Sequence, residues 1–373
     1  MKIATFKLER WFAKYEFKAP YLLCSSDCES LSVQELLALE PGSEQEFQKL
    51  WLGYTESAGS PALRKEISKI YEKTWPNEIL VHTGAEEAIF NFMNCALKAG
   101  DHLIVQYPCY QSLLEIAQSI GCEVTKWESY EEMGWELDPN FLLKNIKSNT
   151  RAIVINCPHN PTGYLMSRGK FEQIMDLAKG RDLLVFSDEV YRGLEYNERD
   201  RLPAACDVYE NAVSLGVLSK AQGLAGLRVG WVATRNQTIY RAMEGFKDYL
   251  TICNSAPSEF LATIAMRHNF QIVERNLEII RQNLALLEPF FQRWQHVFNW
   301  QKPKAGAIAF PSLKLKTDIE EFCVDLVEKQ GVLLLPGNYY DYGNKNFRIG
   351  FGRKNMPQAL EKLEEYLTER IKE

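Results

Sequence analysis

The feature that most constrains the fold is a series of short apolar runs, rich in β-branched residues, that alternate with amphipathic segments. The runs lie at 102–106, 152–156, 183–187 and 229–233. Continuous apolar runs of this length are typical of strands buried on both faces of a sheet. Helical segments such as 170–179 separate several of them, so the expected fold is α/β, with a mainly parallel sheet and right-handed crossovers. Functional side chains are then expected at the carboxyl ends of the strands.

Local signals predict where several helices begin. Ser60 followed by Pro61 is typical of an N-cap with proline at the first helical position. A second helix is predicted to follow Gly84, because apolar residues recur at helical spacing as far as Ala96. A terminal helix is expected after Asn355.

The chain length predicts two domains, because 373 residues are about two and a half times a typical domain. Residues 1–45 are expected to form an irregular arm that packs with the smaller domain. Residues 46–270 are expected to form the large domain, and 271–373 a smaller α+β domain. The amphipathic stretch at 272–297 opens this smaller domain and is expected to bend or break near Pro289.

Composition narrows the function classes. The formal net charge of −6 disfavours nucleic acid and anionic membranes as partners. No stretch approaches the ~18 apolar residues of a membrane span, and the start of the chain lacks a secretory apolar region, so a cytoplasmic location is expected. The nine cysteines are scattered, which disfavours a disulfide framework, and no two of the five histidines have the short spacing of a metal site.

The segment most informative about chemistry contains Lys220, shortly after a predicted strand at 212–217. At the mouth of a buried sheet, desolvation would favour the neutral amine that a Schiff-base nucleophile requires. For this segment alone, a surface lysine in a glycine-rich loop is an equally open interpretation. The glycines that follow do not form the G-x-G-x-x-G pattern of a dinucleotide site.

Two other strand ends carry polar groups of different kinds. Asp188 directly follows the run at 183–187, with Tyr191 three residues later, and Asn160 follows the run at 152–156. Alone, Asp188 would be interpreted as a cap or turn residue and Asn160 as part of an Asn-Pro turn. Together with Lys220 they match a planar heterocycle that carries a ring nitrogen, a phenolic oxygen and a phosphate.

Taken in order along the chain, these segments resemble the fold-type I pyridoxal-phosphate (PLP) enzymes, specifically the class I/II aminotransferases. The resemblance runs from about Tyr54 to Phe351, and the ordered set is more specific than any one motif. It rests on Tyr54, Gly84-Ala85-Glu86, Pro108-Cys109-Tyr110, Asn160-Pro161-Thr162-Gly163, Asp188-Glu189-Val190-Tyr191, Ser219-Lys220 with Arg228, and Arg348.

The resemblance implies PLP as cofactor and a role for each matched residue. Lys220 would hold the cofactor as a Schiff base and move a proton between the substrate α-carbon and the cofactor. Asp188 would keep the pyridine nitrogen protonated. Asn160 and Tyr191 would hydrogen-bond the ring's O3′.

The resemblance also implies how the phosphate is held. The backbone N–H groups of Ala85 and Glu86, in the helix that follows Gly84, would bind it at the positive end of the helix dipole. Ser219 would add a hydroxyl and Arg228 a fixed charge. The side chain of Glu86 is expected to point away.

The remaining implied contacts concern the ring faces, the substrate and the partner subunit. Tyr110 would stack on one ring face and Val190 would pack on the other. Arg348, together with Asn160, would bind the α-carboxylate of the substrate. Tyr54 would reach the phosphate in the other subunit, so a homodimer with shared active sites is expected.

The resemblance predicts transfer of an amino group from an L-amino acid to a 2-oxo acid, and alternatives stay open. Val217 stands where the family often has Ser or Thr, and the arm segment 24–29 departs from the family pattern. That segment resembles the capreomycidine synthase branch, so a PLP-dependent lyase or cyclase is the alternative. A ligand-sensing regulator is disfavoured, because no basic helix-turn-helix pattern lies among the roughly 50 residues before Tyr54.

Overall fold

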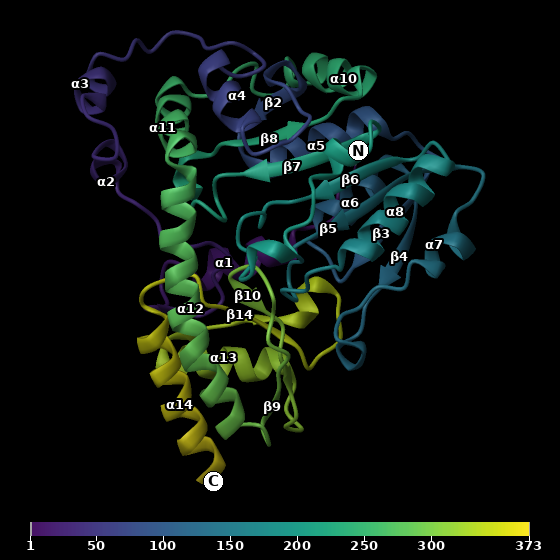
Figure 1. The fold of residues 1–373 in the computed structure, drawn as a ribbon. Helices are drawn as coiled ribbons and strands as arrows, with labels where there is room; N and C mark the ends of the chain where they lie inside the picture. The colour runs from purple at the N-terminus through teal and green to yellow at the C-terminus, as the bar shows by residue number, and fades with distance from the viewer. Residues whose placement is uncertain (1, 373) are drawn as a thin grey trace.

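A seven-stranded sheet forms the centre of the larger part of the molecule in the computed structural model, which describes residues 2–372 (Figure 1). Only β8 runs antiparallel to its neighbours, so the expected α/β class with a mainly parallel sheet is confirmed. In spatial order the strands are β2 (Ile79–His82), β8 (Gly230–Ala233), β7 (Ala212–Val217), β6 (Leu184–Asp188), β5 (Thr150–Asn156), β3 (His102–Tyr107) and β4 (Glu123–Glu128).

Helices flank this sheet (Figure 1). Helix α5 packs on β7 and β8 and contacts α6 and α10, and its predicted apolar stripe is buried, with the Phe92 ring centroid 4.5 Å from that of Phe186. The helices of this region are α4 (Pro61–Ser68), α5 (Gly84–Ala96), α6 (Ser112–Ile120), α7 (Asn140–Asn145), α8 (Arg168–Gly180), α9 (Ala205–Val208), α10 (Gln237–Lys247) and α11 (Ala256–Arg267). The predicted cap of α4 is confirmed, since the Ser60 hydroxyl accepts from the Leu63 N–H.

The long helix α12 (Asn269–Arg293) follows α11 directly and runs from the sheet region into the C-terminal region (Figure 1). Of the bend or break predicted near Pro289, the break is absent, because the helix continues four residues further. Proline removes one N–H donor, which would have bonded the carbonyl of Ala285. Leu287 and Phe290 on either side are fully buried, and this packing holds the helix together.

The C-terminal region is built from two helices and three small sheets. The helix expected after Asn355 is present, with Leu363 and Leu367 buried in it. The helices are α13 (Ile319–Gln330) and α14 (Met356–Lys372). The sheets are β10 (Ile308–Ala309) with β14 (Phe347–Gly350) and β13 (Leu335–Pro336), β11 (Ser312–Leu313) with β9 (Phe298–Asn299), and β1 (Tyr21–Leu22) with β12 (Val332–Leu333).

The N-terminal segment is more ordered than the predicted irregular arm. It contains α1 (Lys7–Tyr15), α2 (Val33–Leu37) and α3 (Ser43–Gln48). Helix α1 forms because Leu8, Trp11 and Tyr15 recur at helical spacing and are buried together. Strand β1 pairs in parallel with β12, and the Trp11 indole N–H donates to the Leu334 carbonyl at 3.0 Å. These contacts support our proposed division into an arm, a large domain and a small domain.

Five single turns of 3₁₀ helix complete the described chain. They are η1 (Pro76–Glu78), η2 (Glu131–Met133), η3 (Glu198–Asp200), η4 (Ala225–Leu227) and η5 (Gly337–Tyr340). Of these, η4 and η5 lie next to the site described below.

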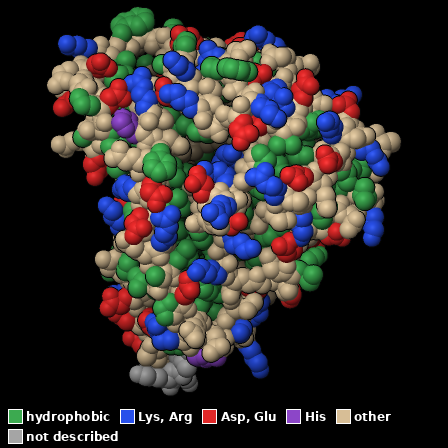
Figure 2. Space-filling model, in the orientation of Figure 1, with side chains coloured by type: hydrophobic (Ala, Val, Ile, Leu, Met, Phe, Trp, Pro, Cys, Tyr) green, Lys and Arg blue, Asp and Glu red, His purple; other side chains and the backbone are tan. Residues whose placement is uncertain are grey.

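Acidic and basic side chains are interspersed over the face shown in Figure 2. Within residues 2–372, no helix is both long and apolar enough to cross a membrane. The same residues contain no group of three or more His, Cys, Asp or Glu side chains that could hold a metal ion.

Candidate active site

A cavity of about 430 Å³ lies where β5, β6 and β7 end, between the sheet, the arm and the C-terminal region. Ten of the predicted site residues line it, although they come from segments far apart in the sequence. They are Ala85, Glu86, Tyr110, Asn160, Asp188, Val190, Ser219, Lys220, Arg228 and Arg348.

Lys220 lies three residues beyond β7, and its amine faces the arm. Its Nζ donates a hydrogen bond of 2.8 Å to the hydroxyl of Ser26. Burial lowers the pKa of Lys220, an effect that Asp27 opposes and Arg348 reinforces. This environment favours the neutral amine, which is the form that can attack a carbonyl.

Asp188 ends strand β6 and is 5% exposed. Burial raises the pKa of Asp188 to about 7, although the Val190 N–H donates to its Oδ1 at 3.2 Å and Lys220 lies nearby. No described cationic side chain forms an ion pair with this carboxyl group. A protonated ring nitrogen in the cavity would supply the missing positive partner.

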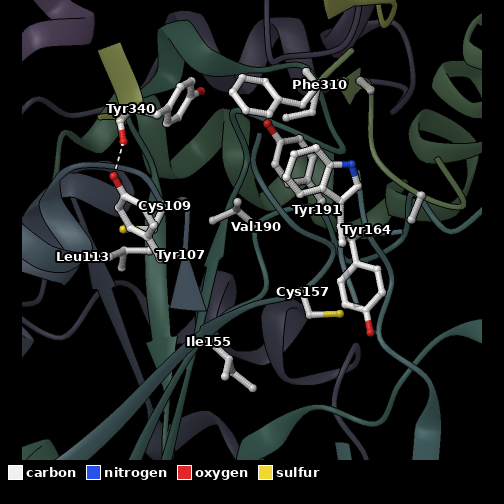
Figure 3. Close-up of a cluster of buried hydrophobic side chains, with 14 of the residues drawn as sticks. Tyr107, Cys109, Leu113, Ile155, Cys157, Tyr164, Val190, Tyr191, Phe310 and Tyr340 are labelled. Carbon is white, nitrogen blue, oxygen red and sulfur yellow. Dashed lines mark hydrogen bonds between the residues drawn. The ribbon is translucent and has the colours of Figure 1, made fainter. Parts of the chain in front are cut away.

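Asn160 and Tyr191 lie beside this carboxyl group, but they differ in which hydrogen-bonding atoms are already used within the protein. The Asn160 side-chain oxygen accepts hydrogen bonds within the protein, while its amide nitrogen has no protein acceptor among the described residues. The Tyr191 ring is buried (Figure 3). The Lys220 Nζ lies 6.0 Å from the centroid of this ring. Its hydroxyl donates to the carbonyl of Ser26 at 3.0 Å, so a bond to O3′ from this hydroxyl would have to replace that donation.

The beginning of α5 forms a narrow cradle suited to a phosphate. Gly84 has a φ of +84°, and a Cβ there would lie 2.6 Å from a nitrogen of the Arg228 guanidinium. A Cβ at Gly230 would lie 2.9 Å from the Ala85 nitrogen. Only glycine therefore allows the strand and the guanidinium to approach the first N–H groups of the helix this closely.

Glu86 lies in the first turn of this helix and lines the cavity, yet its carboxylate is occupied. It accepts a hydrogen bond from the hydroxyl of Ser112, and burial raises the pKa of Glu86. A raised pKa favours the neutral acid, which reduces repulsion of an anion at the helix start. Ser219 lines the same end of the cavity, as does Val217, which offers no hydroxyl there.

Tyr110 and Val190 lie on the cavity wall as the ring-face contacts require. Burial raises the pKa of Tyr110 well above its ordinary value, so the ring stays neutral. Val190 lies two residues beyond the end of β6, and Figure 3 shows it among buried aromatic side chains that include Tyr191. The donor set and the cradle thus fit PLP.

Arg348, on β14, is 2% exposed and forms no ion pair with a described carboxylate. Its Nε and Nη2 donate to the backbone carbonyl of Cys24 at 3.1 and 2.9 Å. Its Nη1 donates to the Tyr340 hydroxyl at 2.7 Å. A buried guanidinium without a carboxylate partner beside a cavity is well suited to bind a substrate carboxylate.

The sequence did not single out the contributions of the arm. Ser26 contacts both Lys220 and Tyr191, and Asp27 forms a two-point ion pair with Arg353 at 3.1 and 2.8 Å. Phe12 of helix α1 also lines the cavity, and its helical spacing from Leu8 was the one available signal. The contact from Cys24 comes from its backbone, which leaves no pattern in a sequence.

Tyr54 is the one predicted residue that the structure leaves far from this cavity. It is 86% exposed and lines a different cavity, together with Trp51 and Phe260. This position within one chain is compatible with the predicted role in a neighbouring subunit.

Three comparisons connect this geometry with known proteins. The family profile "Aminotransferase class I and II" matches residues 21–363. Capreomycidine synthase from Streptomyces vinaceus is 28% identical over 365 residues, covering 96% of this chain and 93% of that protein. A solved PLP-dependent aminotransferase from Streptococcus suis 89-1591 is 33% identical, with a TM-score of 0.93 and 99% of both chains covered.

A second solved structure, the PLP-dependent cyclase OrfR, is 26% identical with a TM-score of 0.90, covering 99% of this chain and 98% of that one. The profile match spans most of the sequence, and the cavity holds a donor set that fits PLP. The chain therefore belongs to the class I and II aminotransferase family of PLP-dependent enzymes.

Proposed function

We propose that this enzyme transfers the amino group of an L-amino acid to a 2-oxo acid. The observation that carries the proposal is the meeting of three groups in one cavity: the desolvated amine of Lys220, the buried carboxyl group of Asp188 and the unpaired guanidinium of Arg348. Each has its own part in amino transfer, as an attaching amine, a partner for the ring nitrogen and a binder of the substrate carboxylate.

When bound, PLP withdraws electrons from the α-carbon of an attached amino acid. In our proposal the start of α5, Ser219 and Arg228 bind its phosphate, and Asp188 holds a proton on the ring nitrogen. Lys220 attaches the cofactor and then moves a proton at the α-carbon. Arg348 binds the α-carboxylate and so holds the substrate against the ring.

The second candidate is a cyclisation or elimination on an amino acid. It is favoured by the similarity to capreomycidine synthase and to the cyclase OrfR, which the chain matches over nearly its whole length. The residues that would bind the cofactor serve either reaction. The outcome depends on which substrate bond stands perpendicular to the ring, and the arm residues around Ser26 and Asp27 line the space where the substrate would lie.

The visible absorption spectrum of the purified protein with PLP tests the proposal. We expect a band from the bound cofactor that gives way to the pyridoxamine form with particular L-amino acids and returns with a 2-oxo acid. Mass spectrometry of the products identifies the donor. Release of ammonia, or a cyclic product with the cofactor unchanged, would replace transamination by the second candidate.

We also propose a homodimer. Tyr54, Trp51 and Leu52 are exposed by 86, 80 and 76%, an arrangement suited to a contact with a second subunit. A subunit placed there would bring its Tyr54 to the neighbouring phosphate, and analytical ultracentrifugation of the holoenzyme tests the expected mass.

A further inference from the structure

We propose that Tyr340 is a positioning residue, which sets the orientation of the Asn160 amide toward the cofactor and of the Arg348 guanidinium toward the substrate carboxylate. This inference rests on the function proposed above. Tyr340 has no place in the resemblance described from the sequence, and its side chain is 3% exposed.

The main chain places this tyrosine between the two regions of the molecule. It ends η5, which follows β13, and β13 pairs with β14 so that Leu335 lies opposite Arg348. The Tyr107 hydroxyl, on β3 of the large sheet, lies 2.8 Å from the Tyr340 carbonyl and donates to it (Figure 3). The main chain at Tyr340 is therefore held by contacts with both regions.

The Tyr340 hydroxyl links the two site residues by hydrogen bonds of defined direction. The Arg348 Nη1 donates to it at 2.7 Å, and it donates to the Asn160 Oδ1 at 3.0 Å. A guanidinium has no acceptor, so the hydroxyl must accept from Arg348 and pass its single hydrogen to Asn160. Burial raises the pKa of Tyr340 to about 12, which keeps that hydrogen in place at neutral pH.

This direction fixes the amide of Asn160. The atom of Asn160 that faces Tyr340 meets two donors, the hydroxyl and the Arg348 Nη1 at 3.4 Å, so it must be the oxygen. The amide nitrogen then points the other way, with no protein acceptor among the described residues. Its N–H groups would then be free to donate to the O3′ of a bound cofactor, whose anionic form they would stabilise.

The same hydroxyl determines which hydrogens of Arg348 remain for a substrate. The Cys24 carbonyl takes one hydrogen from Nε and one from Nη2, and the Tyr340 hydroxyl takes one from Nη1. One hydrogen on each terminal nitrogen is left, and the one on Nη1 makes only the long contact with Asn160. A carboxylate that binds the end of the guanidinium with both oxygens would use these two hydrogens.

The test compares Tyr340→Phe with Tyr342→Phe. Phenylalanine keeps the ring that packs edge-on against Phe310 at 5.7 Å and removes only the hydroxyl. Tyr342 belongs to the same loop, and its hydroxyl donates to the Ser129 carbonyl at 3.2 Å, away from Arg348 and Asn160. It therefore controls for the loss of a hydroxyl from this loop.

Two readouts separate a positioning role from a structural one. The first is the pH midpoint of the visible band of the bound cofactor, which is set by the groups around O3′. The second is the pair of dissociation constants for an unreactive 2-methyl amino acid and for the corresponding amine without a carboxylate. Both are measured on the holoenzyme without turnover.

We expect Tyr340→Phe to raise the midpoint by about half a pH unit or more, since one fixed donor to O3′ is lost. The 2-methyl amino acid should bind about fivefold more weakly, and the amine less than twofold. Tyr342→Phe should leave both readouts at the wild-type values. In an Asn160→Ala background the effect of Tyr340→Phe on the midpoint should disappear, because it acts through that amide.

Unchanged midpoint and binding in Tyr340→Phe would overturn the inference while leaving the proposed function intact. Equal changes in Tyr340→Phe and Tyr342→Phe would also overturn it, since loop packing would then explain both. Absence of any cofactor band in the wild-type protein would overturn the proposed function and the inference together.

Discussion

The amine of Lys220 donates its hydrogen bond to the hydroxyl of Ser26, 194 residues earlier in the chain. The side chain of Lys220, three residues beyond strand β7, is thus held by the N-terminal arm. The arm also forms one wall of the cavity. The position of Lys220 therefore depends on strand β7 and on the N-terminal arm, which belong to different sheets and are far apart in the sequence.

Lys220→Ala should abolish attachment of the cofactor and lower turnover at least about 100-fold, because the attacking amine and the proton carrier are both removed. Borohydride reduction followed by mass spectrometry checks the attachment. The exposed Lys179→Ala serves as the control. A reduced cofactor adduct of normal yield in Lys220→Ala would show that another lysine is the attachment site.

Asp188 makes the stability of the cofactor-free protein pH-dependent. Burial raises the pKa of Asp188 from 3.8 to about 7 in the folded protein. Between these values the folded state holds a proton that the unfolded state has lost, so the free energy of unfolding falls as pH rises, by up to about 1.4 kcal/mol per pH unit. Asp188→Asn removes this titration and should flatten the profile.

Thermal unfolding of the cofactor-free protein from pH 4.5 to 8 checks this expectation. The exposed Asp176→Asn is the matched control and should follow the wild type. Parallel profiles for wild type and Asp188→Asn would contradict the raised pKa. With PLP bound, Asp188→Asn should keep the cofactor but lose most activity, since asparagine cannot hold a positive ring nitrogen.

Arg348→Ala should lower kcat/KM for an amino acid by at least about 30-fold, which corresponds to about 2 kcal/mol for a lost charge-assisted contact. An amine that lacks the carboxylate should be affected far less, and the ratio of the two losses is the measurement. Arg348→Lys keeps the charge without the planar fork and should recover only part of the loss. Equal losses for both substrates would exclude this role.

Gly230→Ala should weaken the binding of PLP and leave the fold intact. The added Cβ would lie 2.7 Å from the Gly84 carbonyl carbon and 2.9 Å from the Ala85 nitrogen, so the start of α5 has to move. We expect a loss of at least about tenfold in affinity, measured by fluorescence titration of the cofactor-free protein. Gly245→Ala meets no atom within 4 Å and should be stabilising by about 0.5–1 kcal/mol without changing the affinity.

A mixed dimer tests the proposed sharing of sites. Tyr54→Phe should weaken cofactor binding, and Lys220→Ala should be inactive, each as a homodimer. In the mixed dimer, the site with an intact Lys220 receives an intact Tyr54 from the other chain, so activity should return to about half of wild type per dimer. Mixtures no more active than their components would count against a site shared between subunits.

The sequence was sufficient for the elements with strong periodicity. The buried runs became β3, β5, β6 and β8, and the stripe after Gly84 became α5. Strand β4 was not predicted, because it lies at the edge of the sheet and its Glu123–Glu128 sequence is largely polar. Pro289, where a bend or a break was expected, does not break helix α12, since burial of the neighbouring residues outweighs one lost hydrogen bond.

For the site, prediction succeeded where a side chain follows a strand, as for Asp188 and Lys220, and their meeting in one cavity follows from the parallel sheet. Contacts that form only through long-range packing could not be predicted. Ser26 is an ordinary polar residue in sequence, and Tyr340 gains its partners only when β13 pairs with β14. No local pattern encodes either contact.

The carbonyl of Cys24 holds the guanidinium of Arg348 across 324 residues of chain, and β14 also hydrogen-bonds the arm through the Gly350 N–H and the Leu23 carbonyl. During translation the arm leaves the ribosome long before its partner strand has been made. The strands of the large sheet and Lys220 are thus made before Arg348, which would bind the substrate carboxylate. The part of the cavity that would bind a substrate carboxylate is therefore the part whose residues are made last.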